Sequence, residues 1–205
     1  MDIKKLIKDA HDNAVEKGFY DCPECGGDGF VGPEDRHGII CPTCKGSKIN
    51  PNKNIGELLC LISGELTGEA LESHRNGRFA ELKAYESNIK EFPEDQKHFY
   101  LYYMKDRFED EISDVFIRLF DLCGYLRIGI KWNGADENTG NIGQTLYRIS
   151  RLLPSDKVAY MPFSYNGFFS AMINFCKWQK IDIEKHITAK MAYNKTRPYK
   201  HGKKY

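Results

Sequence analysis

The chain has 205 residues, of which 41% are hydrophobic and 29% charged, so it can bury one sizeable core or two small ones. Its formal net charge of +1 produces no overall field, and charge as a whole therefore implies neither a nucleic-acid-binding nor a membrane-binding surface. No apolar run approaches the ~20 residues of a membrane span, and the N-terminal segment lacks a signal-peptide core. These features predict a cytoplasmic protein that makes no contact with a membrane.

The N-terminal fifth of the chain contains two CxxC pairs. Residues 1–18 predict a helix that ends at Gly18, and Cys22, Cys25, Cys41 and Cys44 follow it. A CxxC turn presents two thiolates to one tetrahedral ion, which favours a zinc site over a redox pair or a disulfide. Four cysteine ligands close the coordination shell, so the zinc is expected to be structural. The CxxCxGxG form resembles the knuckles of DnaJ-type zinc domains, and residues 21–49 are predicted to be an inserted zinc ribbon.

Other residues of this region have two readings. Arg36, His37, Lys45 and Lys48 would suit contacts with a nucleic-acid backbone, but scattered cations on a small loop are also common as solubilising charges. The three cysteines outside the ribbon, Cys60, Cys123 and Cys176, lie in apolar helical patterns and are expected to be buried free thiols.

The body of the protein is predicted to be all-α, formed by residues 1–20 and 50–205. Apolar residues recur at helical spacing over about 54–75, 100–124, 142–153, 166–179 and 182–194. Some helix is expected around 79–89, and the glycine-containing stretch 129–140 is expected to be a loop.

Carboxylates recur at helical spacing in two of these predicted helices. Glu65, Glu69 and Glu72 share one face of the first, and Glu111 and Asp114 share one face of the second. Because an apolar stripe runs beside each acidic stripe, packing of the two helices would bring the carboxylates together. Converging carboxylates repel one another and are the usual ligands of hard divalent cations, so this pattern predicts a site for Mg²⁺ or Mn²⁺. The alternative is that they are solvated charges on amphipathic helices.

The sequence also contains two pairs of similar segments, which we call the internal echo. Residues 54–63 parallel residues 141–150, and residues 123–128 can be set against residues 176–181. On that register Glu57 corresponds to Gln144, and the acids Glu111 and Asp114 correspond to Ser164 and Gly167. We interpret residues 141–181 as a degenerate second copy of a helical hairpin that has lost its acids. The same similarity also arises by chance between amphipathic helices.

Four segments together resemble the MazG-type nucleotide pyrophosphohydrolases. They are residues 1–20, residues 54–75 with their acidic stripe, residues 108–128 with Glu111 and Asp114, and residues 181–204. Members of that family are all-α, bind Mg²⁺ through an ExxE and an ExxD pair, and cleave nucleoside triphosphates to monophosphate and pyrophosphate. Glu111 and Asp114 match the ExxD motif directly.

The resemblance departs from the family pattern in the first acidic motif. Glu65 precedes Glu69 by four residues where the family has three. A one-residue insertion, accommodated as a π-bulge, would keep Glu65 on the acidic face. The alternative first pair is Glu69 with Glu72. The resemblance thus implies Glu65, Glu69, Glu111 and Asp114 as magnesium ligands. Glu69 or Glu72 would act on the attacking water.

The resemblance also implies roles for the basic C-terminal segment. Lys190, Asn194 and Arg197 recur on one helical face and would bind the phosphates or sugar of the substrate. The other reading of this segment is a solvated basic tail. Because related sites form between helix pairs, a homodimer is expected unless the internal echo supplies the second pair.

Two functions from different classes follow from the sequence. The first is a Mg²⁺-dependent nucleoside triphosphate pyrophosphohydrolase that removes unwanted nucleotides from the cellular pool. The second is a module that binds nucleic acid or protein through the zinc ribbon, with the helical body as an inactive scaffold.

Overall fold

The computed structural model describes residues 1–32, 38–155, 157–161 and 163–202, which form two compact units. The first unit comprises Met1–His11 and Ile55–Thr196. The second comprises Asp12–Asn54 and the chain from Arg197 onward. Helix α1 (Ile3–Glu16) runs across the boundary between them.

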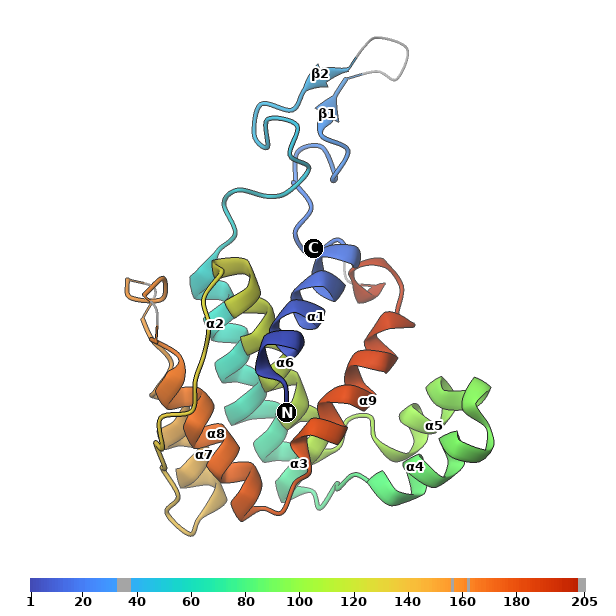
Figure 1. The fold of residues 1–205 in the computed structure, drawn as a ribbon, viewed down its shortest axis with the longest axis vertical. Coiled ribbons are helices and arrows are strands. Elements are labelled where there is room, and N and C mark those ends of the chain that lie inside the picture. Colours follow the sequence, from blue (N-terminus) through green and yellow to red (C-terminus); the bar gives the residue numbers. More distant parts are fainter. Residues whose placement is uncertain (33–37, 156, 162, 203–205) are drawn as a thin grey trace. The chain divides into compact units, whose positions relative to one another are not determined.

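The first unit is built from helices, as predicted (Figure 1). Its longest helix is α6 (Phe108–Leu126). The others, in chain order, are α2 (Ile55–Gly64), the π-helical η1 (Glu65–Ala70), α3 (Leu71–Arg75), α4 (Leu82–Glu91), the 3₁₀ turn η2 (Pro93–Asp95), α5 (Gln96–Tyr103), α7 (Ile142–Ser150), α8 (Asn166–Trp178) and α9 (Ile183–Lys195). None of the described helices offers an apolar stretch of the length needed to cross a bilayer.

Helix α6 is the centre of this unit and packs against α2, η1 and α9. Eleven of its nineteen residues are buried, which is why its sequence is apolar on more than one face. Phe116, Leu119 and Phe120 belong to the main core. A smaller cluster of Tyr85, Tyr100, Met104 and Tyr193 joins α4 and α5 to α9. Because α6 is fixed on several sides, polar side chains along it are held in defined positions.

The internal echo has matching local structure at both ends. Helices α2 and α7 begin at corresponding residues, Ile55 and Ile142, and bury corresponding leucines, Leu59 and Leu146. Helices α6 and α8 end in the same way. The N–H of Ile128 donates to the carbonyl of Cys123, and the N–H of Ile181 donates to the carbonyl of Cys176. The residue before each isoleucine, Arg127 or Lys180, has a positive φ. These are Schellman-type helix ends, so the echo extends from sequence to backbone conformation.

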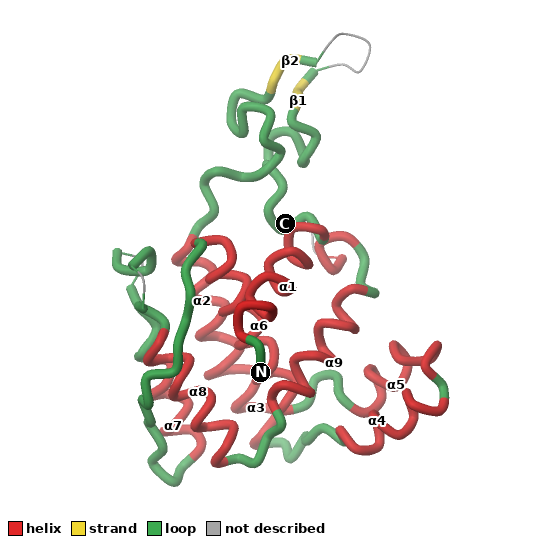
Figure 2. The backbone as a smooth tube through the Cα atoms, viewed as in Figure 1, coloured by secondary structure: helices red, strands yellow, loops and turns green. Residues whose placement is uncertain are grey.

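The second unit contains a small antiparallel ribbon of β1 (Phe30–Val31) and β2 (Ile39–Ile40), in which Phe30 pairs with Ile40 (Figure 2). The segment η3 (Tyr199–Gly202), a turn in which Lys200 and His201 have positive φ, also belongs to this unit. Arg36 and His37, predicted as ribbon cations, lie outside the described residues.

The boundaries of the units differ from the predicted ranges 1–20, 21–49 and 50–205, because the C-terminal segment is attached to the second unit. The Tyr199 hydroxyl donates to Asp21 Oδ2 at 2.5 Å, and the Lys200 N–H donates to the carbonyl of Lys17 at 2.8 Å. Gly18 allows this attachment. It has a positive φ of 77°, and a Cβ on it would lie 2.0 Å from the Tyr199 ring.

The structure corrects three further expectations. The helix predicted over about 100–124 is divided by a turn into α5 and α6. Cys60 is exposed, whereas Cys123 and Cys176 are buried as predicted. Cys60 lies on α2 beside exposed Leu61, on the face opposite the core residues Leu59 and Ile62. The helix predicted over 142–153 ends at Ser150, since the chain continues from there in turns.

Candidate functional site

The structure gathers the four ribbon cysteines into one buried group. Their sulfur atoms all lie within 4.8 Å of one another. Cys22 Sγ lies 3.8 Å from Cys41 Sγ, and Cys25 Sγ lies 3.7 Å from Cys44 Sγ. A zinc ion with four bonds of about 2.3 Å would place its sulfurs about 3.8 Å apart, whereas a disulfide needs about 2 Å. The group is therefore suited to a tetrahedral metal ion and not to disulfides.

Backbone conformation around the cysteines suits metal binding as well. The N–H of Gly29 donates to Cys25 Sγ at 3.2 Å, which stabilises a thiolate. Gly27, with a φ of 93°, lies where a Cβ would meet the Asp21 carboxylate at 2.9 Å. The glycines that follow the first CxxC thus provide backbone that a larger residue would not adopt at this position.

A second group of potential metal ligands lies in the helical unit. Single carboxylate oxygens of Glu65, Glu111 and Asp114 all lie within 4.8 Å of one another. Glu65 is the first residue of the π-helical η1, while Glu111 and Asp114 lie three residues apart on α6. The packing of η1 against α6 brings them together, as the sequence predicted. We call these three residues the acidic group.

The π-helix occupies the position where an inserted residue was predicted. Its i→i+5 hydrogen bonding takes one more residue per turn than an α-helix, so an insertion is absorbed without rotating the flanking segments. Leu66 and Ala70 of η1 remain buried, and Ile62 before it is buried too. Glu65 thereby faces α6 while the apolar side of the helix stays in the core.

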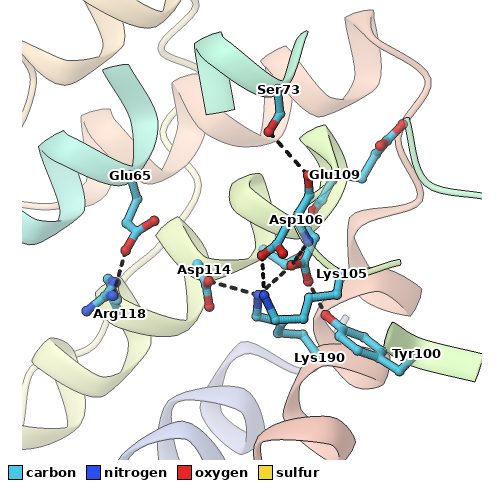
Figure 3. Close-up of polar contacts among 11 residues, drawn as sticks. Glu65, Ser73, Tyr100, Lys105, Asp106, Glu109, Asp114, Arg118 and Lys190 are labelled. Carbon is cyan, nitrogen blue, oxygen red and sulfur yellow. Dashed lines mark hydrogen bonds and ion pairs between the residues drawn. The ribbon is translucent and has the colours of Figure 1, made fainter. Parts of the chain in front are cut away.

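Two cations pair with Glu65 and Asp114 of the acidic group (Figure 3). Arg118 Nη2 lies 2.6 Å from Glu65 Oε1, and Arg118 continues the α6 face that carries Glu111 and Asp114. Lys190, on α9, places its Nζ 2.8 Å from Asp114 Oδ2. The same Nζ lies 2.7 Å from Oδ2 of Asp110.

Asp110 is buried and is bound from several sides. The Tyr100 hydroxyl donates to its Oδ1, and the N–H of Asp106 donates to its Oδ2 at 3.0 Å. Tyr100 stacks on Tyr193 of α9, with ring centroids 4.5 Å apart. The position of the Lys190 ammonium is therefore fixed by a network and not by one ion pair.

Burial and repulsion shift the ionisation of these groups. Burial, reinforced by the charges of Asp110, Asp114 and Glu65, raises the pKa of Glu111 to about 8, although Lys190 opposes the shift. Burial also raises the pKa of Asp110 above its ordinary value. For Lys190, burial alone would lower the pKa, but the neighbouring Asp114 and Asp110 outweigh it and raise the pKa. The Lys190 ammonium therefore stays charged. A cation bound beside Glu111 would stabilise the ionised form of its carboxyl group.

Other predicted site residues lie outside this arrangement. Glu69 and Glu72 are exposed, and neither belongs to a described group of metal-binding side chains. Asn194 is buried on the same face of α9 as Lys190, and its Oδ1 has no hydrogen-bond partner among the described residues. Arg197 belongs to the second unit.

Sequence reasoning missed Asp110, Tyr100 and Arg118. Arg118 was detectable, because it follows Asp114 by four residues on the acidic face of α6. Asp110 is 100° away from Glu111 around α6, and nothing in the sequence pattern predicts that α9 packs against that side.

Comparison with protein-family models, with curated proteins and with solved structures finds no match to this chain.

Proposed function

We propose that this protein is a Mg²⁺-dependent nucleoside triphosphate pyrophosphohydrolase that cleaves its substrate to a monophosphate and pyrophosphate. The observation that carries the proposal is the acidic group, in which Glu65, Glu111 and Asp114 converge from two packed helical segments. The π-helical segment at Glu65 supports it, because π-bulges are frequent at functional sites.

The residues of the acidic group fit a hard divalent ion. Octahedral Mg²⁺ with bonds of about 2.1 Å has ligand oxygens about 3 to 4 Å apart. The carboxylate oxygens, all within 4.8 Å of one another, need only small side-chain movements to reach that spacing. All three donors are carboxylates, which Mg²⁺ and Mn²⁺ prefer over nitrogen and sulfur donors.

In this reaction Glu65, Glu111 and Asp114 would hold the cation, which neutralises triphosphate charge and lowers the pKa of a bound water when present. Exposed Glu69 and Glu72 follow Glu65 along the same chain segment, and one of them would orient the attacking water toward the α-phosphorus. The water oxygen would bond to the α-phosphorus as the bond from that phosphorus to the bridging oxygen breaks, so pyrophosphate would leave with the bridging oxygen and its negative charge, and the water proton would pass to the orienting carboxylate or to solvent.

The basic residues have separate roles in the proposal. The Lys190 ammonium has three N–H donors and uses two of them on Asp110 and Asp114, so the third is suited to a phosphate oxygen. Asn194, with its buried unpartnered Oδ1, would accept a hydrogen bond from the sugar. Phosphate binding by Arg197 stays a prediction from the resemblance.

The proposal is tested by a matched pair of glutamine variants. Glu111→Gln keeps the size of the side chain but removes a metal-binding charge, and is expected to lower the rate of Mg²⁺-dependent pyrophosphate release at least ~10²-fold. Glu91→Gln, at the exposed end of α4, is the control and should match the wild type. Equal activity of the wild type and Glu111→Gln would show that the catalytic site is elsewhere.

One observation favours a second candidate, a protein-binding role for the ribbon. Phe30, Ile39 and Ile40 are 52%, 71% and 59% exposed on the paired strands β1 and β2, and exposed apolar patches commonly mark protein-interaction sites. Replacing all three by Ser should then abolish capture of a partner without changing pyrophosphate release. A nucleic-acid role would instead give salt-dependent binding that falls when Lys45 and Lys48 are neutralised.

A further inference from the structure

Lys190 contacts one member of each of two overlapping sets of carboxylates. One is the acidic group of Glu65, Glu111 and Asp114, and the other consists of Asp106, Asp110 and Glu111. In each set, single oxygens of all members lie within 4.8 Å of one another, and Glu111 belongs to both. Sites that hold two metal ions about 3.5–4 Å apart commonly join them in this way, through a shared carboxylate.

The Lys190 ammonium joins the two sets. It lies 2.7 Å from Asp110 Oδ2, in the second set, and 2.8 Å from Asp114 Oδ2, in the first. Only 6% of the Lys190 side chain and 1% of the Asp110 side chain are exposed. An ammonium at this depth is tolerated because two carboxylates flank it.

The charges of the cluster agree with a single additional ion. The buried or half-buried carboxylates are Glu65, Asp110, Glu111 and Asp114, and the cations bound to them are Lys190 and Arg118. With all four carboxylates ionised, as they would be around a bound metal ion, four negative and two positive charges leave a formal charge of −2, which one divalent ion neutralises. Exposed Asp106 is separately paired with Lys105.

We propose that Lys190 is a built-in cation that occupies the place of a second metal ion. The acidic group then binds one divalent ion per chain, and Asp110, held by Tyr100, positions the ammonium beside it. The inference rests on the proposed function, because it assumes that the acidic group is a metal site.

The first test counts Mn²⁺ bound to the full-length zinc-loaded protein, by equilibrium dialysis and by electron paramagnetic resonance. The expected result is one Mn²⁺ per chain with the spectrum of an isolated ion. Two ions with a spin-coupled spectrum would overturn the role of Lys190, even if pyrophosphate release were observed. Binding of no Mn²⁺ would overturn the proposed function and this inference together.

The second test removes the ammonium. Lys190→Met is expected to bind a second Mn²⁺ in the set that contains Asp110, and the double variant Lys190→Met with Asp110→Asn is expected to bind only one. Lys185→Met is the matched control, because Lys185 lies on the same helix but pairs with Glu86. Binding of a single Mn²⁺ by folded Lys190→Met, with unchanged affinity, would overturn the inference. If Lys190→Met does not fold, the number of Mn²⁺ ions bound per wild-type chain tests the inference by itself.

Discussion

At the scale of single residues, the described side chains include titratable groups whose burial sets their charge. Glu111 is one, with a pKa raised to about 8. Its burial among other acids destabilises the metal-free protein near neutral pH, and this is the expected cost of a preformed cation site. His186 is another, since it is only 4% exposed on α9 and its Nδ1 has no hydrogen-bond partner among the described residues.

His186 leads to a prediction about acid stability. Burial lowers its pKa from 6.5 to about 4, although the charges of Asp182 and Glu86 oppose the shift. Below pH 6.5 the unfolded chain therefore binds a proton that the folded chain rejects, so stability present above pH 6.5 is lost as the pH falls toward 4. The loss attributable to His186 is at most ~1.4 kcal/mol per pH unit.

The measurement is urea unfolding between pH 4 and pH 7 for the wild type and His186→Gln. The free energy of unfolding should decline less steeply in the variant than in the wild type. If the free energy of unfolding fell with the same slope in the wild type and in His186→Gln, His186 would have the same pKa in the folded and unfolded states, and the prediction would be wrong.

At the scale of elements, the π-helical η1 determines whether Glu65 reaches α6. A regular α-helix from Ile55 to Arg75 would rotate either Glu65 or the buried residues after it by about 100°. The extra residue in the π turn removes this conflict, and it also accounts for the four-residue separation of Glu65 and Glu69.

A one-residue deletion tests the role of η1. Gly68 is exposed, and nothing lies within 4 Å of a Cβ built on it. Its deletion should convert η1 to α-helix with a change in Tm of only a few degrees, and would place Glu65 and Glu69 three residues apart. Deletion of exposed Cys60, within the regular α2, should instead rotate the core residues that follow and unfold the protein at far lower temperature. Thermal unfolding, followed by circular dichroism, gives the Tm of each variant. An equal decrease in Tm for the two deletions would contradict this role of η1.

The elements also show what sequence reasoning can predict. The helices and the convergence of Glu65 with Glu111 and Asp114 follow from hydrophobic periodicity and from the spacing of the acids. The π turn followed from a one-residue mismatch to a family pattern. The contacts of Lys190 with Asp110 and Asp114 did not follow, because they depend on how α9 crosses α6, which no local pattern specifies. The attachment of Tyr199 to Asp21 is likewise a long-range contact without a periodic signal.

At the scale of the whole molecule, the chain consists of two compact units with different sources of stability. The helical unit has a large apolar core. In the second unit the described buried cluster consists of the four cysteines with Val31 packed beside them. Such a small core contributes little by itself, so this unit is expected to depend on its metal ion.

Zinc content tests this division. The purified protein should contain one zinc ion per chain, and Cys41→Ser should lose it, because it removes one of the four ligands. Cys60→Ser, which alters an exposed thiol outside the group, is the control and should keep the ion. Colorimetric zinc release checks both, and helical circular dichroism should change little on chelation. Equal zinc contents in the two variants would exclude the assigned ligands.

Homodimer formation is the other prediction at this scale. The resemblance implies a dimer, whereas the structural echo between α2 and α7 and between α6 and α8 favours two helix pairs within one chain. The molar mass measured by sedimentation equilibrium distinguishes a dimer from a monomer that contains both helix pairs.

The central claim is that the acidic group supports attack at the α-phosphorus of a nucleoside triphosphate. The most direct measurement is ³¹P nuclear magnetic resonance of the products after incubation of the wild-type protein with Mg²⁺ and a panel of canonical and modified NTPs and dNTPs. Nucleoside monophosphate and pyrophosphate are expected in equal amounts from at least one substrate. Nucleoside diphosphate with orthophosphate, or no product from any substrate despite bound metal, would contradict the central claim.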